Sequence, residues 1–145
     1  KWVEAKVSSA VAMEPIAEIF TADKVRADLD KGIVTIFGGG TGNPFFSTDS
    51  AAALRAAQIK AEVIFKATNV DGVYDKDPNK FDDAVKFDEL TQSELLSRGL
   101  QVMDASAASL CRDNGINILV FDLTDSENIV RAVSGENVGT LCLSE

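Results

Sequence analysis

The sequence predicts an α/β fold with a mainly parallel β-sheet and flanking helices. Three observations support this prediction: short β-branched apolar runs alternate with helical segments, capping residues stand where helices should begin, and glycines stand where they should end. Strands separated by helices are usually parallel neighbours in one sheet. With 145 residues, 46% of them apolar and 26% charged, the chain has the size and composition of one globular domain.

Each element can be assigned to a range of the chain. From the N-terminus, the expected order is a helix over 22–31, a strand over 33–37, a helix from the segment 47–50 to Lys60, a strand over 62–67, a short helix from Thr91, a helix over 105–114, a strand over 116–121, a helix over 126–134 and a strand over 140–143. No repeat, low-complexity segment or linker interrupts this order, so residues 1–145 are expected to belong to one domain.

Local signals place the elements of the first half. Thr21 is positioned to cap the first helix, and Gly32 suits the left-handed conformation that follows a helix. The run 33–37 is β-branched and mostly apolar, which fits a strand buried on both faces of a parallel sheet. Residues 47–50 offer several caps for the second helix, and Asp49 is expected to cap it rather than to contact a ligand. The mostly apolar run 62–67 predicts the next strand.

Capping and closing residues also bound the elements of the second half. Residues 91–94, Thr-Gln-Ser-Glu, form a capping box, and Asp104 is expected to cap a helix that Gly115 closes. The last helix carries an apolar face that we expect to point inward, formed by Ile129, Val130 and Val133. Apolar runs between and after these helices predict the final strands.

Composition excludes several functional classes. The net charge of −9 lacks the basic footprint of a nucleic-acid binder, and no apolar run approaches the length of roughly 20 residues that a membrane helix needs. No charged-then-apolar leader is visible, so we expect a cytoplasmic protein, or a plastid protein after removal of a transit sequence. The chain contains no histidine, which excludes Ser-His-Asp and Cys-His nucleophiles and His-ligated zinc. Cys111 and Cys142 are expected to be buried free thiols.

The stretch 38–46, Gly-Gly-Gly-Thr-Gly-Asn-Pro-Phe-Phe, is the leading candidate for a binding site. It leaves an expected strand and enters a helix, so its N–H groups and the helix N-terminus can bind phosphate. Its glycines permit close approach of the backbone to a ligand, and Phe45 and Phe46 can wall a flat ring such as a nucleobase. A tight turn with two core phenylalanines is the alternative. The P-loop and dinucleotide-binding motifs do not match, because the lysine and the third glycine are missing.

Longer motifs make the assignment more specific. The run 40–78, the segment 101–121 and the C-terminal segment 135–145 closely resemble the bacterial-type uridylate (UMP) kinases of the amino-acid kinase family. This resemblance implies transfer of the ATP γ-phosphoryl group to UMP, which gives UDP for pyrimidine nucleotide biosynthesis. Such chemistry suits a chain without histidine, because alignment and charge neutralisation supply most of the catalysis of phosphoryl transfer.

The resemblance also implies roles for particular residues. Asp104 is the catalytic candidate and would orient a lysine or Mg²⁺ near the reaction centre. Thr68, Tyr74 and Asp77 would bind ATP, and Mg²⁺ would arrive with ATP, so no metal ligand set is assigned to the protein itself. The UMP site would be formed by Thr41, Gly42, Asn43, Pro44, Phe45, Phe46, Ser47 and Thr48.

Family members are typically homo-oligomers, namely hexamers regulated by GTP and UTP, and we expect the same partners here. Residues 1–145 would be the C-terminal part of the enzyme, because the family's glycine-containing phosphate loop and its lysine would precede residue 1. The chain alone is therefore expected to be inactive, and Lys66 is not assigned to the missing lysine's role. Two alternatives are another amino-acid kinase that acts on a carboxylate or carbamate, and a non-catalytic nucleotide-binding module.

Overall fold

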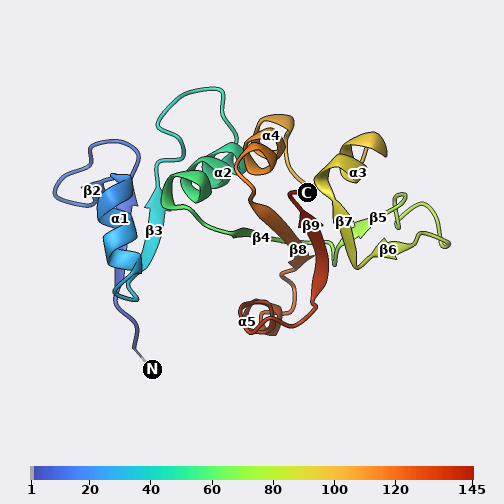
Figure 1. Ribbon diagram of the computed structural model, residues 1–145. Coiled ribbons are helices and arrows are strands. Elements are labelled where there is room, and N and C mark those ends of the chain that lie inside the picture. Colours follow the sequence, from blue (N-terminus) through green and yellow to red (C-terminus); the bar gives the residue numbers. More distant parts are fainter. Residues whose placement is uncertain (1) are drawn as a thin grey trace.

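A computed structural model describes residues 2–145 and places helices and strands in the alternating order expected for an α/β protein (Figure 1). The helices are α1 (Ala22–Leu29), α2 (Thr48–Ile59), α3 (Gln92–Ser97), α4 (Ala105–Asp113) and α5 (Glu127–Val133). The strands are β1 (Ala5–Ser9), β2 (Glu18–Ile19), β3 (Val34–Gly38), β4 (Val63–Thr68), β5 (Val73–Tyr74), β6 (Lys86–Phe87), β7 (Glu89–Thr91), β8 (Asn117–Asp122) and β9 (Gly139–Leu143).

The strands form two main sheets and a hairpin. The first sheet has the order β2-β1-β3, and all its neighbours are parallel. The second has the order β4-β8-β9-β7, in which only the β8–β9 pair is antiparallel. Strands β5 and β6 form a separate antiparallel pair. The predicted class, α/β with mainly parallel pairing, is confirmed, although the strands do not form one continuous sheet.

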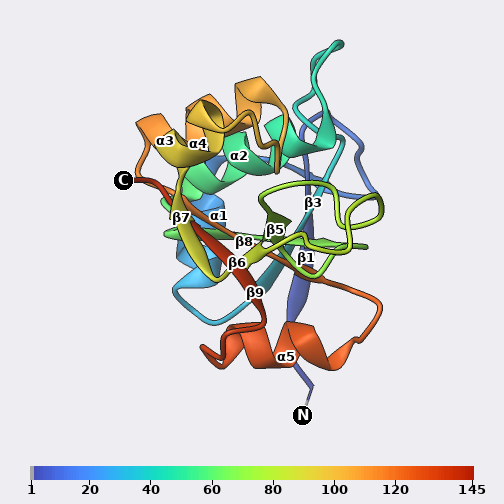
Figure 2. The same cartoon turned by 90° about the vertical axis from the view of Figure 1, so that its right-hand side faces the viewer.

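Helices cover the second sheet from both sides. Figures 1 and 2 show α2, α3 and α4 on one face of this sheet and α5 on the other. Helix α1 contacts both β3 and α2, so it joins the first sheet to the rest of the molecule. None of the helices in the described part of the chain combines the length and the apolarity that crossing a membrane requires.

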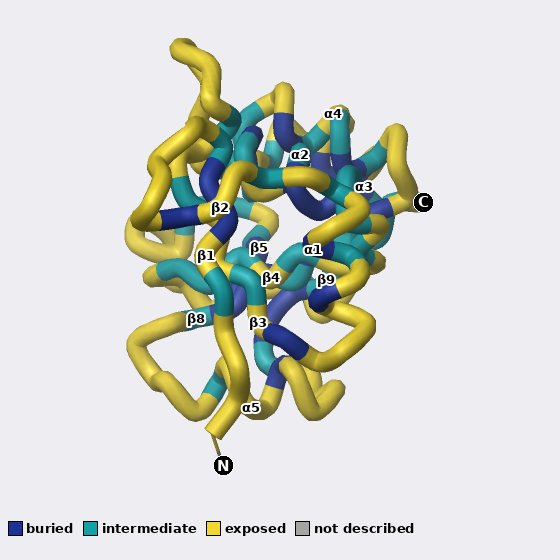
Figure 3. Tube along the Cα trace, turned by 90° about the vertical axis from the view of Figure 1, so that its left-hand side faces the viewer, coloured by how far each residue is buried: buried dark blue, intermediate teal, exposed yellow. Residues whose placement is uncertain are grey.

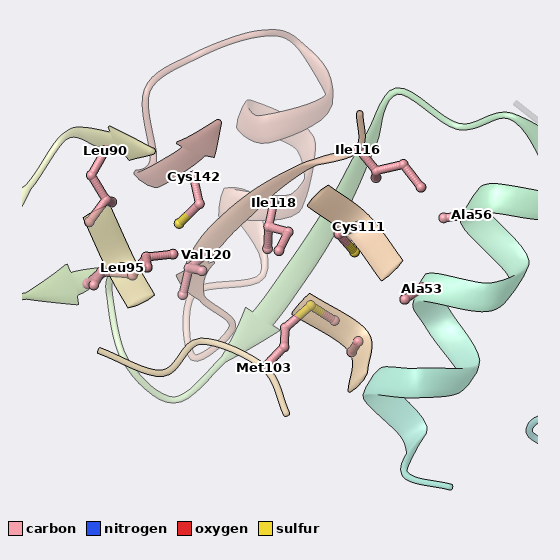
Figure 4. Packing of buried hydrophobic residues seen from close by; sticks show 12 residues of the cluster. Ala53, Ala56, Leu90, Leu95, Met103, Cys111, Ile116, Ile118, Val120 and Cys142 are labelled. Atoms are coloured by element: carbon pink, nitrogen blue, oxygen red, sulfur yellow. The ribbon is translucent and has the colours of Figure 1, made fainter. Parts of the chain in front are cut away.

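The core lies between the second sheet and the helices α2, α3 and α4 (Figure 4). Small residues of α2 let this helix pack closely against α4, and the inward side chains of β8 fill the space beneath them. Both cysteines are free and fully buried, as predicted. The cluster consists of Ala53, Ala56, Val73, Leu90, Leu95, Met103, Ala107, Cys111, Ile116, Ile118, Val120 and Cys142.

Two predictions of burial are wrong. Strand β3 is not buried on both faces, because Val34 and Ile36 are about half exposed. The trace of β3 is exposed or intermediate along its length (Figure 3). In α5, the buried residue is Ala132, whereas the residues expected to point inward are exposed, namely Ile129, Val130 and Val133. In both cases the element has an apolar face, but no other helix or strand within residues 2–145 packs against that face.

Two of the four capping predictions are confirmed. Thr91 and Glu94 form the full capping box of α3, and the Asp104 carboxylate caps α4 by accepting from the Ala107 N–H at 2.9 Å. Thr21 precedes α1 but its side chain makes no capping hydrogen bond. Asp49 is not the cap of α2, because that role belongs to Ser47, whose hydroxyl accepts from the Ser50 N–H at 3.0 Å.

Candidate functional site

The glycine-rich segment leaves β3 and projects from the body of the protein before it enters α2 (Figures 1 and 2). Gly39, Gly40 and Gly42 all have positive φ angles, between +61° and +78°, which favour glycine. A Cβ on Gly42 would lie 3.1 Å from the carbonyl oxygen of Ala10, so the segment also passes close to the end of β1. These requirements fix the path of the loop.

Hydrogen bonds within the loop use two of its N–H groups. The Gly42 N–H donates to the Gly39 carbonyl at 3.1 Å, and the Asn43 N–H donates to the Thr41 hydroxyl at 3.1 Å. Residues 2–145 provide no acceptor for the N–H of Thr41 or for those of residues 45–48, at the N-terminus of α2. Free backbone donors beside the positive end of a helix dipole form a suitable site for an anion.

The two phenylalanines are not part of the core. Phe45 is fully exposed and Phe46 is more than half exposed, so the alternative of two core phenylalanines is wrong, whereas their role in walling a flat ring stays a prediction. Phe45 has a φ of +69°, an uncommon conformation for a bulky residue. Such strained residues cluster at ligand-binding sites, where the surrounding structure holds them in place.

Asp104 connects the loop to the helix α4. Its carboxylate accepts from the hydroxyls of Ser47 and Ser50, and it also caps α4 through the Ala107 N–H. The Ser47 and Ala107 bonds hold the pKa of the Asp104 carboxyl below its usual range, so the group is ionised at neutral pH. A single carboxylate therefore fixes the N-termini of α2 and α4 relative to each other.

A second contact joins α2 to strand β4. The Lys66 ammonium forms an ion pair with Asp49 in the first turn of α2, and both side chains are about three-quarters buried. Lys66 also lines the neighbouring cavity described below. This lysine is therefore a cationic group beside both the start of α2 and that cavity.

The segment between β4 and α4 surrounds a cavity of about 470 Å³. Thr68, Tyr74 and Asp77 all line it, so the fold brings the three residues expected to bind ATP to one place. Figure 2 shows this segment and the glycine-rich loop on the same side of the molecule. The full lining consists of Lys66, Thr68, Val70, Gly72, Val73, Tyr74, Lys76, Asp77, Pro78, Gly99, Leu100, Gln101, Val102 and Val120.

Polar contacts stabilise the hairpin that carries Tyr74. The Tyr74 hydroxyl donates to Asp71 at 2.8 Å, and this bond raises the pKa of the phenol above its usual value. Lys86 on β6 also contacts Asp71, at 3.2 Å. On the other side of the hairpin, the Asp77 carboxylate accepts from the Asn79 N–H, which lowers the pKa of Asp77.

Thr140 of β9 joins the hairpin to the second sheet. Its fully buried hydroxyl accepts from the Val73 N–H at 2.8 Å and donates to the Phe87 carbonyl at 2.5 Å. Val73 and Phe87 are opposite each other in the β5–β6 pair, so one hydroxyl bridges both strands. A Cβ on Gly72 would lie 2.5 Å from the Thr140 hydroxyl, which explains a glycine at this position.

The substitution Thr140→Val is expected to loosen this hairpin. Valine keeps the shape but leaves the Val73 N–H and the Phe87 carbonyl without their partner, which costs about 1–3 kcal/mol of unfolding free energy. Thermal unfolding would measure the loss, and hydrogen exchange should show faster exchange at the Val73 amide. Thr140→Ser retains the hydroxyl and is the control. Equal protection of Val73 in the valine and serine variants would contradict the role assigned to the hydroxyl.

Sequence reasoning missed three sets of contacts around these features. The Lys66–Asp49 pair joins residues 17 positions apart, and the Thr140 bonds span 53 and 67 positions, so no local pattern reveals them. Arg55 is buried on α2 and donates to the Gly40 carbonyl of the loop at 3.1 Å. An arginine in a helix is usually exposed, and the sequence gives no sign of its burial.

Comparisons with known proteins identify the family and the fold. The sequence profile of the Amino acid kinase family matches residues 4–122. Among solved structures, UMP kinase from Ureaplasma parvum superposes with a TM-score of 0.90 at 38% sequence identity, and UMP kinase from Bacillus anthracis with 0.93 at 32%. Uridylate kinase from Archaeoglobus fulgidus superposes with a TM-score of 0.66 at 41% identity.

These alignments cover most of the chain but only part of each solved structure. They include 97%, 99% and 87% of the chain, and 60%, 59% and 60% of the three structures, in the same order. The chain therefore spans about three fifths of the length of the solved structures it matches.

Proposed function

The chain belongs to the amino acid kinase family, and on this premise we propose that it forms the C-terminal part of a nucleoside monophosphate kinase. The reaction is transfer of the γ-phosphoryl group of ATP to UMP, which gives ADP and UDP. The observation that carries this proposal is the likeness, over nearly the whole chain, to two UMP kinases at TM-scores of 0.90 and 0.93. Formation of UDP would serve pyrimidine nucleotide biosynthesis.

UMP would bind at the glycine-rich loop. The free N–H groups of Thr41 and of residues 45–48 supply donors for its phosphate, and the α2 N-terminus supplies a partial positive charge. Phe45 and Phe46 stand exposed beside these donors, where their rings can cover the uracil base once the nucleotide is bound. The proposed site comprises Thr41, Gly42, Asn43, Pro44, Phe45, Phe46, Ser47 and Thr48.

ATP would occupy the cavity at the hairpin. Thr68, Tyr74 and Asp77 line this space, where the Tyr74 ring can cover the adenine or ribose and Asp77 can accept from a hydroxyl or amino group. Lys66 lies between this cavity and the start of α2, so its charge is available to the donor phosphates. In the reaction, a phosphate oxygen of UMP forms a bond to the γ-phosphorus, and the bond from the γ-phosphorus to the β–γ bridging oxygen breaks.

Asp104 would be the catalytic carboxylate. Its links to Ser47 and to the Ala107 N–H fix it where the acceptor loop meets α4, and its low pKa keeps it ionised. Mg²⁺ fits this arrangement, because it usually binds one or two carboxylates together with substrate phosphates and keeps several waters. When bound with ATP, Mg²⁺ neutralises phosphate charge, and Asp104 is the residue that would contact it.

Residues 1–145 would need a preceding segment to complete the domain. Strands β3 and β4 each lie at an edge of their sheet, and α2 connects them. The exposed apolar side chains of β1 and β3 lie on an uncovered face, where a further strand or helix would pack. We propose that the preceding segment supplies this layer, the donor-phosphate loop and a lysine. The complete protein would be a cytoplasmic or plastid hexamer that responds to GTP and UTP.

The test is a measurement of UDP formation from ATP and UMP. The full-length polypeptide that contains this chain is expected to form UDP, whereas residues 1–145 alone are expected to show no appreciable turnover. The reason is that, in this proposal, the loop and the lysine that hold the transferred phosphoryl group belong to the segment that precedes residue 1. Normal turnover by residues 1–145 alone would overturn the proposal that a preceding segment is needed to complete the domain.

The same assay distinguishes the alternatives. Phosphorylation of a small carboxylate or carbamate, with no reaction of UMP, would favour a different member of the family. Binding of UMP and ATP without product, even by the full-length polypeptide, would favour a non-catalytic nucleotide-binding module. A screen of nucleoside monophosphates against small acids, combined with a measurement of UMP and ATP binding, therefore separates all three possibilities.

A further inference from the structure

Arg55 is a buried cation without a carboxylate partner. Its side chain lies on α2 and is only 7% exposed, and no Asp or Glu in residues 2–145 forms a salt bridge with it. Burial lowers the pKa of its guanidinium. Buried charges are usually paired because their removal from water is unfavourable. This exception therefore indicates a specific role.

Three contacts hold the guanidinium in place. One nitrogen donates to the Gly40 carbonyl at 3.1 Å, and another donates to the Gln58 side chain at 2.7 Å. The group also stacks over the Phe20 ring, 4.1 Å from its centroid, and Phe20 is itself packed edge-on against Phe37 of β3. The guanidinium is therefore held next to the glycine-rich loop, where it donates a hydrogen bond to one of the loop's carbonyl oxygens.

The contacted carbonyl belongs to the same peptide unit as the free Thr41 N–H. In a planar trans peptide, the C=O of Gly40 and the N–H of Thr41 point in opposite directions. The cation on the oxygen side fixes the orientation of this peptide, and it polarises the unit so that the N–H becomes a stronger donor. Gly40 has a φ of +61°, which allows the peptide to take this orientation without steric strain.

We propose that Arg55 is a positioning residue of the anion-binding loop. Its guanidinium orients and polarises the Gly40–Thr41 peptide so that the Thr41 N–H binds the phosphate of the acceptor nucleotide. This inference rests on the proposed function and specifies how its acceptor site recognises a phosphate monoester. Such a group carries about two negative charges at neutral pH. The charge of Arg55 acts on it through one peptide, without direct contact, in a protein whose net charge is −9.

The test compares UMP with uridine, which lacks the phosphate. In the full-length polypeptide, Arg55→Met is expected to raise the dissociation constant for UMP about ten-fold, the effect of losing one charge-assisted interaction. The dissociation constant for uridine and the KM for ATP should stay unchanged. Arg55→Lys, which retains a charge and a donor, should restore part of the UMP affinity. Arg112→Met is the matched control, because Arg112 pairs with the neighbouring Asp113 on another helix.

The possible outcomes separate this role from a merely structural one. Equal losses of UMP and uridine affinity, or no loss of UMP affinity in a folded variant, would overturn the proposal. If Arg55→Met does not fold, Arg55→Gln removes the charge while keeping a donor for Gly40, and the same criteria apply to it.

A further measurement keeps the inference separate from the proposed function. Inorganic phosphate is expected to shift the NMR signal of the Thr41 amide in the wild-type protein and not in Arg55→Met. If the wild-type protein binds no UMP but shows this shift, the proposed function fails and the role of Arg55 is supported. If phosphate causes no shift in the wild-type protein, the role of Arg55 is overturned.

Discussion

Asp104→Asn in the full-length polypeptide is expected to lower kcat for UDP formation about 100-fold, the size of effect that misplacement of reacting groups can produce. Asparagine is as good an N-cap as aspartate, so the side-chain oxygen at position 104 should still cap α4 by accepting a hydrogen bond from the Ala107 N–H. The substitution removes the negatively charged carboxylate, which accepts hydrogen bonds from the Ser47 and Ser50 hydroxyls and which would contact the metal bound to ATP. Steady-state kinetics with both substrates varied would measure the change.

The control for this substitution is Asp113→Asn, at the other end of the same helix. Asp113 is exposed and pairs only with the adjacent Arg112, so its loss should leave kcat unchanged. The pH dependence of stability gives a second check. A carboxylate with a lowered pKa stabilises the fold above its usual pKa, and this contribution disappears as the pH falls through the lowered value. Asp104→Asn should remove that part of the acid sensitivity, and a kcat within a few-fold of wild type would refute a catalytic role.

Gly139→Ala is expected to destabilise the protein more than any other substitution considered. The added Cβ would lie 1.9 Å from the Val120 carbonyl oxygen, and this backbone atom cannot rotate away. Strand β9 would have to move, although it carries the fully buried Thr140 and Cys142. We expect a loss of about 4 kcal/mol of unfolding free energy, hence a fall of about 10 °C in Tm.

Gly38→Ala provides the matched control in thermal unfolding. A Cβ on Gly38 would meet no atom within 4 Å, and this residue does not have a positive φ. Its effect should stay within about 0.5 kcal/mol, as for most surface substitutions. Similar Tm values for the two alanine variants would contradict the close packing of β8 against β9.

The sequence predicted the features that depend on neighbouring residues. The caps at Thr91 and Asp104 are visible because a cap and its partner lie within three positions. Strand β8 is visible because a continuous apolar run bounded by Gly115 and a polar segment fits a buried strand. In the same way, the glycine-rich loop is visible as a connection between an expected strand and an expected helix, which is where the structure places it.

Features that depend on distant parts of the chain were not predictable. Strand β2 has only two residues, so it has no periodicity to detect, and it exists because it pairs with β1. The orientation of α5 was wrong because an apolar stripe does not reveal whether another layer covers it. The burial of Arg55 depends on Phe20 and on the loop at Gly40, neither of which lies near it in sequence.

The complete burial of the two cysteines makes them chemically inert. Burial raises the pKa of Cys111 to about 11 and that of Cys142 to about 12. At neutral pH, at most about one Cys111 thiol in 10⁴ is therefore a thiolate, the form that reacts with alkylating agents and peroxides. The two thiols of the folded protein should consequently resist oxidants, and modification of either cysteine sulfur would report that the core has opened.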